Sequence, residues 1–302
     1  MNRVIEHRVT SAQDGCFLRD LLRRELSISA KLLARIKRTA GGITLNGEAA
    51  HVNVRVKQGD IVKVIIENNE NACANLIPVP GELDIYYEDE DILVINKPAG
   101  IPVQPAIGAP EGALGNIVVW HYAQKGENVI FRPVNRLDSG TSGLMAVAKN
   151  SHVHTALIKT LHTGQFKRKY RAIVHGRFDV ECGSVEAPVC REEGSVLKRT
   201  VHPDGKWAKT NYRVLEEIGD CSLIELELMS GRTHQIRVHM AHIGHPLVGD
   251  FLYGREEQEI IGRFALHSSE MNFAHPISGE EVILECDLPE DMRAAMRKIA
   301  GI

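Results

Sequence analysis

The sequence predicts an α+β protein made of two unequal parts. From Gly81 onward, short apolar runs typical of strands alternate irregularly with helical segments, without the regular βαβ spacing of a doubly wound sheet. A smaller basic unit precedes them, and a polar stretch that ends in prolines, NNENACANLIPVP (68–80), separates the two. A chain of 302 residues is long enough for two domains. We therefore predict a small domain at 1–70, a linker at 71–80 and a larger domain at 81–302.

The composition is that of an ordinary globular protein, with 43% hydrophobic and 25% charged residues. No run of about 18 apolar residues is present, which argues against a membrane span. The N-terminus lacks the apolar core of a signal peptide, so we expect a cytoplasmic protein. Six scattered cysteines without a CxxC pair indicate reduced thiols rather than a disulfide framework or a zinc ribbon.

The basic unit reads as a small α/β domain. Its helices are expected at Phe17–Leu26 and Ala30–Thr39, and its strands at Ile43–Leu45 and Ile61–Ile66. Ser29 is a suitable N-cap for the second helix, and Gly41-Gly42 would stop it. Asn46-Gly47 is a strong signal for a two-residue hairpin turn.

Positive charge is concentrated in this unit, although the whole chain carries −3. Residues 16–67 hold ten basic and five acidic residues, so this segment is +5 and the rest of the chain is −8. Lys31, Arg35 and Arg38 lie at i, i+4 and i+7 of the second predicted helix and form a basic stripe. Such a stripe indicates phosphate binding, and the alternative is a solvated helix face.

The larger part offers six strand candidates and two strong helix candidates. The strands are expected at Ile92–Asn96, Leu144–Ala148, Tyr170–His175, Asn211–Leu215, Ser222–Leu228 and Val282–Cys286. The helices are expected at Ser151–Thr163 and His234–His242.

A guanidinium and a carboxylate, Arg136 and Asp138, stand two residues apart just before the apolar run Leu144–Ala148. The turn between them and this run, Ser139–Gly143, contains two glycines that tolerate unusual backbone angles and three hydroxyls that can hold them. The arrangement indicates a site carboxylate held near the surface. The alternative is that Asp138 only caps the turn, as aspartate commonly does.

Four sequence blocks extend this pattern. They read EDEDILVINKP (88–98), NRLDSGTSGL (135–144), FKRKYRAIVHG (166–176) and SGRTHQIRVHMAHIGHPLVG (230–249), which Asp250 extends. In content and order the blocks resemble the RluA/RluD-type RNA pseudouridine synthases. In the basic unit, ITLNGE (43–48) and VKQGDIVKV (56–64) resemble the alpha-L RNA-binding motif, first recognised in a ribosomal protein.

The resemblance implies a largely antiparallel, strongly bent mixed sheet with the active cleft along its middle. It makes Asp138 the nucleophile, and it gives Arg237 the task of keeping this carboxylate ionised by lowering its pKa. Tyr170 would lie against the uracil face and help to remove the proton from carbon 5. Leu266 would pack beneath the base. Without the resemblance, Tyr170 would read as a strand aromatic and Leu266 as plain core.

Further residues follow from the same blocks. Arg136 is expected to fill the space left when the uridine flips out of its stack. Arg232, the first arginine of the last block, is predicted to bind substrate. Asn135 and Gln104 stand where the family usually has histidine, which bears on the subfamily and target nucleotide more than on the activity.

Neither a metal nor a cofactor is predicted. His234, His239, His242 and His245 cluster in the sequence, but no cysteine or acidic residue precedes Asp250 in this stretch and no H-E-x-x-H motif is present. We expect these histidines to pack and to bond to the backbone. Isomerising uridine requires no redox change and no group donor, so no cofactor is implied.

These features predict an enzyme that isomerises uridines in RNA to pseudouridine, with large-subunit ribosomal RNA as substrate and transfer RNA as the alternative. A non-catalytic RNA-binding or ribosome-assembly factor is a second alternative, but it should have lost Asp138, Tyr170 or Arg237, and all three are present. A nucleoside hydrolase is a third, with little use for the basic unit. We expect a monomer with RNA as partner and no membrane contact.

Overall fold

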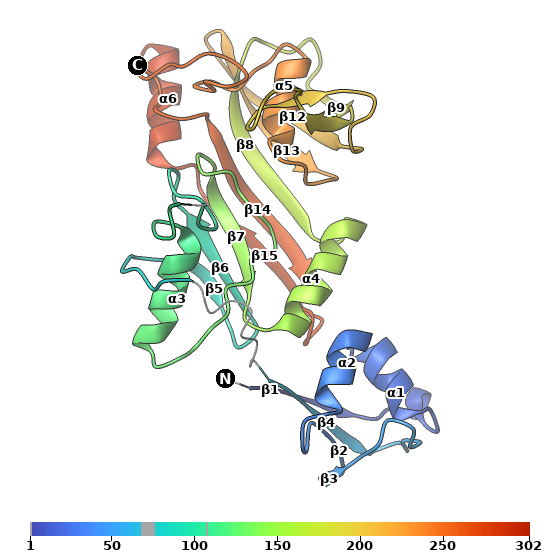
Figure 1. Cartoon of the computed structure of the whole chain (residues 1–302). Coiled ribbons are helices and arrows are strands. Elements are labelled where there is room, and N and C mark those ends of the chain that lie inside the picture. Colours follow the sequence, from blue (N-terminus) through green and yellow to red (C-terminus); the bar gives the residue numbers. More distant parts are fainter. Residues whose placement is uncertain (1, 68–75, 107) are drawn as a thin grey trace.

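The computed structural model describes residues 2–67, 76–106 and 108–302 and confirms the α+β class. Figure 1 shows a small N-terminal domain beside a longer body built around one extended sheet. Residues 71–75 of the predicted linker lie outside the described part. Ile77, beyond them, accepts a hydrogen bond of 2.8 Å from Asn116 Nδ2, which fastens this segment to the larger body. No helix among the described residues is long and apolar enough to cross a membrane.

The small domain combines a four-stranded antiparallel sheet with short helical segments. Its strands are β1 (Arg3–Arg8), β2 (Ile43–Leu45), β3 (Glu48–Ala49) and β4 (Ile61–Ile66), in the order β1-β4-β2-β3. Its helical elements are η1 (Ser11–Gln13), α1 (Leu18–Asp20), η2 (Leu21–Glu25) and α2 (Ala30–Ile36). Both predicted strands are confirmed. So is the hairpin turn, because Asn46 and Gly47 have φ values of 52° and 88°, as a type I′ turn requires.

Both helix predictions in this domain need correction: the first helix is less regular than predicted, and the second is shorter. The segment predicted as one helix at Phe17–Leu26 is a single α turn followed by a π-helical turn. The second helix ends at Ile36 rather than Thr39. The chain turns back there, and Gly42 packs so closely on the carbonyl of Ile36 that a side chain at this position would clash with it.

The small domain contacts the larger body through Arg3. Its Nε and Nη2 atoms each lie 2.9 Å from a carboxylate oxygen of Asp91. Asp91 also accepts a hydrogen bond of 2.8 Å from Asn150 Nδ2 and is only 2% exposed. A bidentate pair of this kind orients the two parts as well as joining them.

The larger body is built on a nine-stranded sheet that is antiparallel except between β7 and β14. Its strands are β5 (Asp84–Glu88), β6 (Ile92–Lys97), β7 (Ser142–Ala148), β8 (Lys167–His175), β9 (Cys182–Glu186), β12 (Lys209–Ile218), β13 (Cys221–Leu228), β14 (Leu266–Ala274) and β15 (Glu281–Glu285). The order is β5-β6-β7-β14-β8-β13-β12-β9, with β15 paired to β14. Strands β10 (Val189–Arg191) and β11 (Arg199–Val201) form a separate hairpin. The predicted strands are all confirmed with small shifts at their ends.

The α-helices of this body are α3 (Leu114–Gln124), α4 (Ser151–Thr163), α5 (Gln235–His242) and α6 (Glu290–Ala300). Helix α4 has the predicted bounds, because Asn150 Oδ1 accepts from Val153 N at its start and Gly164 adopts a left-handed φ of 77° at its end. Helix α5 begins one residue later than predicted, because His234 has a φ of 57°. The elements of this body that were not predicted are helices α3 and α6 and strands β5, β9, β10, β11 and β14.

Strand β14 lies in the middle of the sheet, directly beside the turn that follows Asp138 (Figure 1). It pairs with β7 at His267↔Ser142 and Ser268↔Gly143. A Cβ on Gly143 would clash with the backbone of Ser268, so glycine is required for this approach. Ser142 Oγ and His267 Nδ1 lie 2.9 Å apart. The turn is therefore fastened to the centre of the sheet.

His267 should make the fold sensitive to acid. Its side chain is fully buried, and burial lowers the pKa of the imidazole from 6.5 to about 4. Between these values the unfolded chain binds a proton that the folded chain does not, so stability falls as the pH drops from 6.5 to 4. The full effect is roughly 3 kcal/mol. In denaturant titrations, the stability of the parent relative to His267→Gln should therefore decline over this range, and a constant difference would contradict the assignment.

Candidate active site

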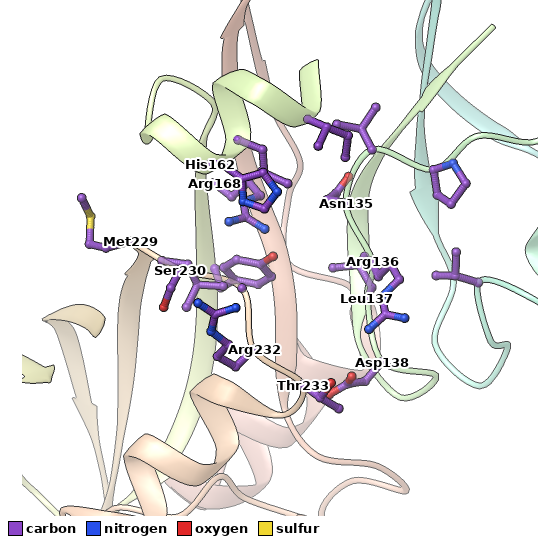
Figure 2. A pocket seen from close by; sticks show the side chains of 18 of the residues that line it. Asn135, Arg136, Leu137, Asp138, His162, Arg168, Met229, Ser230, Arg232 and Thr233 are labelled. Carbon is purple, nitrogen blue, oxygen red and sulfur yellow. The ribbon is translucent and has the colours of Figure 1, made fainter. Parts of the chain in front are cut away.

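A cleft of about 830 Å³ lies between the loop at 133–138 and the segment at 228–233. Figure 2 shows Arg136 and Asp138 on one side of it, with Arg168 and Arg232 on the other. A smaller recess of about 60 Å³ shares part of this lining. Six predicted site residues line the recess: Arg136, Asp138, Tyr170, Arg232, Arg237 and Leu266. The fold thus brings together side chains that are far apart in the sequence.

The carboxylate of Asp138 is half-buried, with 29% of the side chain exposed. Its Oδ2 atom lies 3.9 Å from both Arg237 Nη1 and His234 Nε2, beyond ordinary hydrogen-bond distance. In the turn, Thr141 N donates to the backbone oxygen of Asp138 rather than to the carboxylate. No hydrogen bond joins the carboxylate to another residue in the described part of the chain. It therefore does not cap the turn, and it is available to a substrate.

Two cations hold the Asp138 loop by its backbone carbonyls. Lys97 is fully buried, and its Nζ donates to the oxygen of Ser139 at 3.1 Å. Burial lowers the pKa of this ammonium to about 8. Arg263 Nη1 donates to the oxygen of Gly140 at 2.9 Å, while its Nε is paired with Asp291. The loop is therefore held without use of the Asp138 side chain.

Arg237 is buried at 3% exposure, and its strongest partner is Asp250 rather than Asp138. Its Nε and Nη2 atoms donate to the two oxygens of Asp250, each at 2.7 Å. The guanidinium also lies over the ring of Phe264, 4.0 Å from its centroid. These contacts leave the third guanidinium nitrogen, Nη1, directed at Asp138. The sequence had placed Asp250 in the motif but had given it no role.

Tyr170 and Leu266 form the apolar side of the recess. Tyr170 is 3% exposed, and burial raises the pKa of its hydroxyl, so this group is protonated at neutral pH. A protonated phenol is suited to packing against a base more than to accepting a proton. Leu266, at the start of β14, is 4% exposed and lines the same recess.

The sequence predicted only packing and backbone hydrogen bonds for His234, yet this residue lies beside Asp138. It precedes α5 in a left-handed backbone conformation, which histidine tolerates better than most residues. Its Nδ1 lies 2.9 Å from the hydroxyl of Tyr253. Burial lowers the pKa of its imidazole. The only hint in the sequence was its position three residues before Arg237.

Of the other three histidines in this cluster, His239 and His245 have structural partners, whereas His242 is exposed and does not pack as predicted. His239 bridges the hydroxyl of Thr210 and the backbone oxygen of Ala187, at 2.9 Å each. His245 bonds to the oxygen of His175. No group of three or more His, Cys, Asp or Glu side chains within the described ranges could hold a metal. The cysteines that the structure describes are free thiols, as predicted: Cys16, Cys182, Cys190, Cys221 and Cys286.

Asn135 and Gln104 both line the large cleft. Asn135 is 2% exposed, and its Oδ1 accepts a hydrogen bond of 2.9 Å from Ala146 N, which fixes the start of the Asp138 loop. Gln104 is exposed at the rim. Asn135 therefore supports the loop, whereas Gln104 is an exposed side chain of the cleft lining.

The predicted basic stripe faces α4 of the larger body, but only Lys31 and Arg35 lie on α2, because Arg38 follows the last helical residue, Ile36. Lys31 and Arg38 are exposed. Arg35 is half-buried, with its Nη2 3.2 Å from Ser151 Oγ. These side chains line a groove of about 600 Å³. Among the described residues, Lys31 and Arg38 have no hydrogen-bond or ion-pair partner, while Arg35 also contacts Ser151 of the larger body.

Comparison with known proteins places this site in context. A model described as RNA pseudouridylate synthase matches residues 91–242, which include Asp138, Tyr170 and Arg237. In shape, the chain is similar to human RNA pseudouridylate synthase domain containing 1, with a TM-score of 0.59 and 24% identity. That match covers 72% of this chain and 90% of the human one and bears on the fold.

Relatives match over most of the chain. The uncharacterized RNA pseudouridine synthase YjbO of Bacillus subtilis is 42% identical over 268 residues, covering 89% of this chain and 94% of its own. Ribosomal large subunit pseudouridine synthase D of Zymomonas mobilis is 36% identical, covering 89% and 92%. The protein of the same name from Yersinia pestis is 38% identical, covering 83% and 80%.

Proposed function

The chain belongs to the RluA/RluD-type family of RNA pseudouridine synthases, and on that premise we propose that it modifies specific uridines of large-subunit ribosomal RNA with Asp138 as nucleophile. One observation carries the assignment of the nucleophile. Asp138 is the carboxylate that lines the recess, and its side chain accepts no hydrogen bond from the described residues, while its loop is held by Lys97 and Arg263.

The reaction breaks the bond between ribose C1′ and N1 of the base and joins C1′ to C5. The proton on C5 is lost and N1 gains one, so atoms and electrons balance without a cofactor. Asp138 bonds covalently to the uridine during the exchange and is released when the new bond forms. Arg237, held by Asp250, directs its third nitrogen at the carboxylate and places a positive charge beside it. Tyr170 and Leu266 hold the ring of the base.

The cleft suits a nucleotide that has left its helix. Its volume of about 830 Å³ lies within the usual range for ligand pockets and far exceeds that of the recess holding Asp138. Arg136 is exposed on its edge and forms no hydrogen bond or ion pair within the described residues. It is therefore free to occupy the space that a flipped uridine leaves behind.

Arg136→Ala should slow the reaction mainly on structured RNA. In the parent, the Arg136 side chain would replace the stacking contacts that the RNA loses when the uridine flips out. Without it, we expect the single-turnover rate to fall about tenfold or more on a folded stem-loop. On an unstructured RNA of the same target sequence the loss should be much smaller. Equal losses on the two RNAs would indicate a phosphate contact instead.

Ribosomal RNA is favoured as substrate by the relatives named for the large subunit and by the basic small domain. We propose that this domain is an alpha-L-type RNA-binding module that binds phosphates through Lys31 and Arg38. Structured RNA is recognised largely by its shape and its loops. The small domain and the cleft of the larger body could contact two separate parts of such an RNA.

Removing the stripe should weaken binding without changing the chemistry. In Lys31→Ala/Arg38→Ala, the slope of log Kd against log salt concentration should decrease by about two, because two phosphate contacts no longer release counterions. The maximal single-turnover rate should be unchanged. Lys63→Ala is the control, because Lys63 is paired with Glu6 at 2.9 Å. An equal effect of the control on the slope would refute a specific role for the stripe.

The proposed function is tested by incubating the purified protein with transcripts of large-subunit ribosomal RNA and with unmodified transfer RNA, then mapping pseudouridines chemically. We expect new pseudouridines at defined positions of the ribosomal RNA. Modification of transfer RNA alone would reassign the substrate. Release of free uracil would indicate a hydrolase, and binding without any product would indicate a non-catalytic factor.

A further inference from the structure

His234 lies between Asp138 and two hydrogen bonds that run back to strand β11. The backbone N–H of Arg199, in β11, donates to the hydroxyl oxygen of Tyr253 at 2.8 Å. That hydroxyl lies 2.9 Å from Nδ1 of His234. On the far side of the ring, Nε2 faces Oδ2 of Asp138 at 3.9 Å.

The order of donors along this chain determines the tautomer of the imidazole. Because the Tyr253 oxygen already accepts from Arg199, its own proton is free for donation, and Nδ1 of His234 is the acceptor within reach in the described structure. Burial lowers the pKa of His234, although the charge of Asp138 opposes this shift, so the ring is neutral at neutral pH. A neutral ring that accepts at Nδ1 carries its proton on Nε2, the atom that faces Asp138.

The two oxygens of Asp138 therefore have different surroundings. Oδ2 is approached by His234 Nε2 and by Arg237 Nη1, both at 3.9 Å. In both ion pairs the carboxylate oxygen nearest to the donor is Oδ2, not Oδ1. Distances between catalytic groups in an unliganded site are commonly longer than in the reacting complex, so a small shift brings both donors into hydrogen-bond range.

We propose that His234 is a positioning residue that donates from Nε2 to Oδ2 of Asp138 and so presents Oδ1 to the uridine. This inference rests on the proposed role of Asp138 as nucleophile. It also accounts for the left-handed conformation of His234, with φ 57° and ψ 17°, because this backbone geometry places the ring between Tyr253 and Asp138 at the very start of α5.

Two substitutions of His234 separate the donor from the backbone conformation. Asparagine suits the left-handed region best among ordinary side chains but is too short to reach Asp138. Glutamine suits that region less well, but its amide nitrogen reaches about as far as Nε2 of histidine. His234→Asn should lower the single-turnover rate on the order of 10- to 100-fold with little change in RNA affinity, as expected for loss of a hydrogen bond to a charged group. His234→Gln should recover most of that rate.

Two further variants are needed: Tyr253→Phe tests the role of the tautomer, and His239→Asn is a control for loss of a buried histidine. Tyr253→Phe keeps the ring that lies beside Arg237 but removes the proton that sets the tautomer, so its rate should fall in the same direction as that of His234→Asn, by less. His239→Asn removes a comparable buried histidine from helix α5, but His239 bonds to Thr210 and Ala187 and not to Asp138. Its rate should stay near that of the parent, whatever its melting temperature.

The pattern of rates decides between the outcomes. A near-parental rate for His234→Asn, or a lower rate for His234→Gln than for His234→Asn, overturns the inference and indicates a backbone role alone. If Asp138→Asn is inactive in the same assay, the proposed function survives that result. Full turnover by Asp138→Asn would instead refute the assignment of Asp138 as nucleophile, and the inference about His234 would fail with it.

Discussion

Replacement of Asp138 by asparagine is expected to abolish pseudouridine formation while leaving the fold and RNA binding intact. The amide keeps the size of the side chain but cannot act as a nucleophile, and the loss of such a group lowers rates by at least about 10⁴-fold. Stability should change little or rise, because the carboxylate is 29% exposed and forms no hydrogen bond within the described residues.

Pseudouridine yield, RNA affinity and melting temperature should be measured on one preparation. The parent, if it forms a stable adduct with RNA that carries a fluorinated uracil, should lose this ability with Asp138→Asn. Asp179→Asn is the matched control, because Asp179 is exposed and lines neither the cleft nor the recess. A destabilised Asp138→Asn protein whose folded fraction still turns over would support the turn-capping alternative.

Asp250→Ala is expected to destabilise the protein strongly and to inactivate it. Asp250 is fully buried and accepts both hydrogen bonds of Arg237, so its removal leaves a buried guanidinium without its counter-charge. Breaking such a pair typically costs 3–5 kcal/mol, which corresponds to a fall in melting temperature on the order of 10 °C for a body of this size. Thermal denaturation measures the first effect and the single-turnover rate the second.

A double variant separates the two consequences. Arg237→Met/Asp250→Leu removes both charges and should recover much of the stability, because an apolar pair of similar volume avoids the cost of desolvation. Activity should remain absent, since no guanidinium then faces Asp138. Recovery of activity together with stability would show that Arg237 serves the fold alone.

Local signals in the sequence were sufficient for several elements. Helix α4 has the bounds that were predicted, and the structure shows that Asn150 and Gly164 cap its two ends. The Asn46-Gly47 turn was predicted because few residues adopt its backbone angles without strain.

Other elements depend on distant neighbours. Strand β14 reads LHSSEMNFA, whose buried His267, Ser268 and Ser269 look like a polar loop. They are tolerated inside because Ser142 and the backbone of Leu144 bond to two of them. Helix α3 was missed because its Ile-Val-Val-Trp segment favours strands by propensity, and tertiary packing overrode that preference.

In the site, too, some residues could be predicted from local sequence motifs and others could not. Asp138, Tyr170 and Arg237 were named from their motifs, and the structure brings them to one recess. The supporting residues were not foreseen. Lys97 acts through a carbonyl 42 positions away, and His234 meets Asp138 across nearly a hundred residues, so only the folded chain reveals them.

The central claim, that this chain makes pseudouridine in ribosomal RNA through Asp138, is tested most directly by genetic complementation. Pseudouridines should be mapped in ribosomal and transfer RNA from cells without the gene, with the parent gene restored and with Asp138→Asn restored. We expect defined sites in large-subunit RNA to disappear on deletion, to return with the parent and to stay absent with the variant. An unchanged map after deletion, or full restoration by Asp138→Asn, would contradict the account.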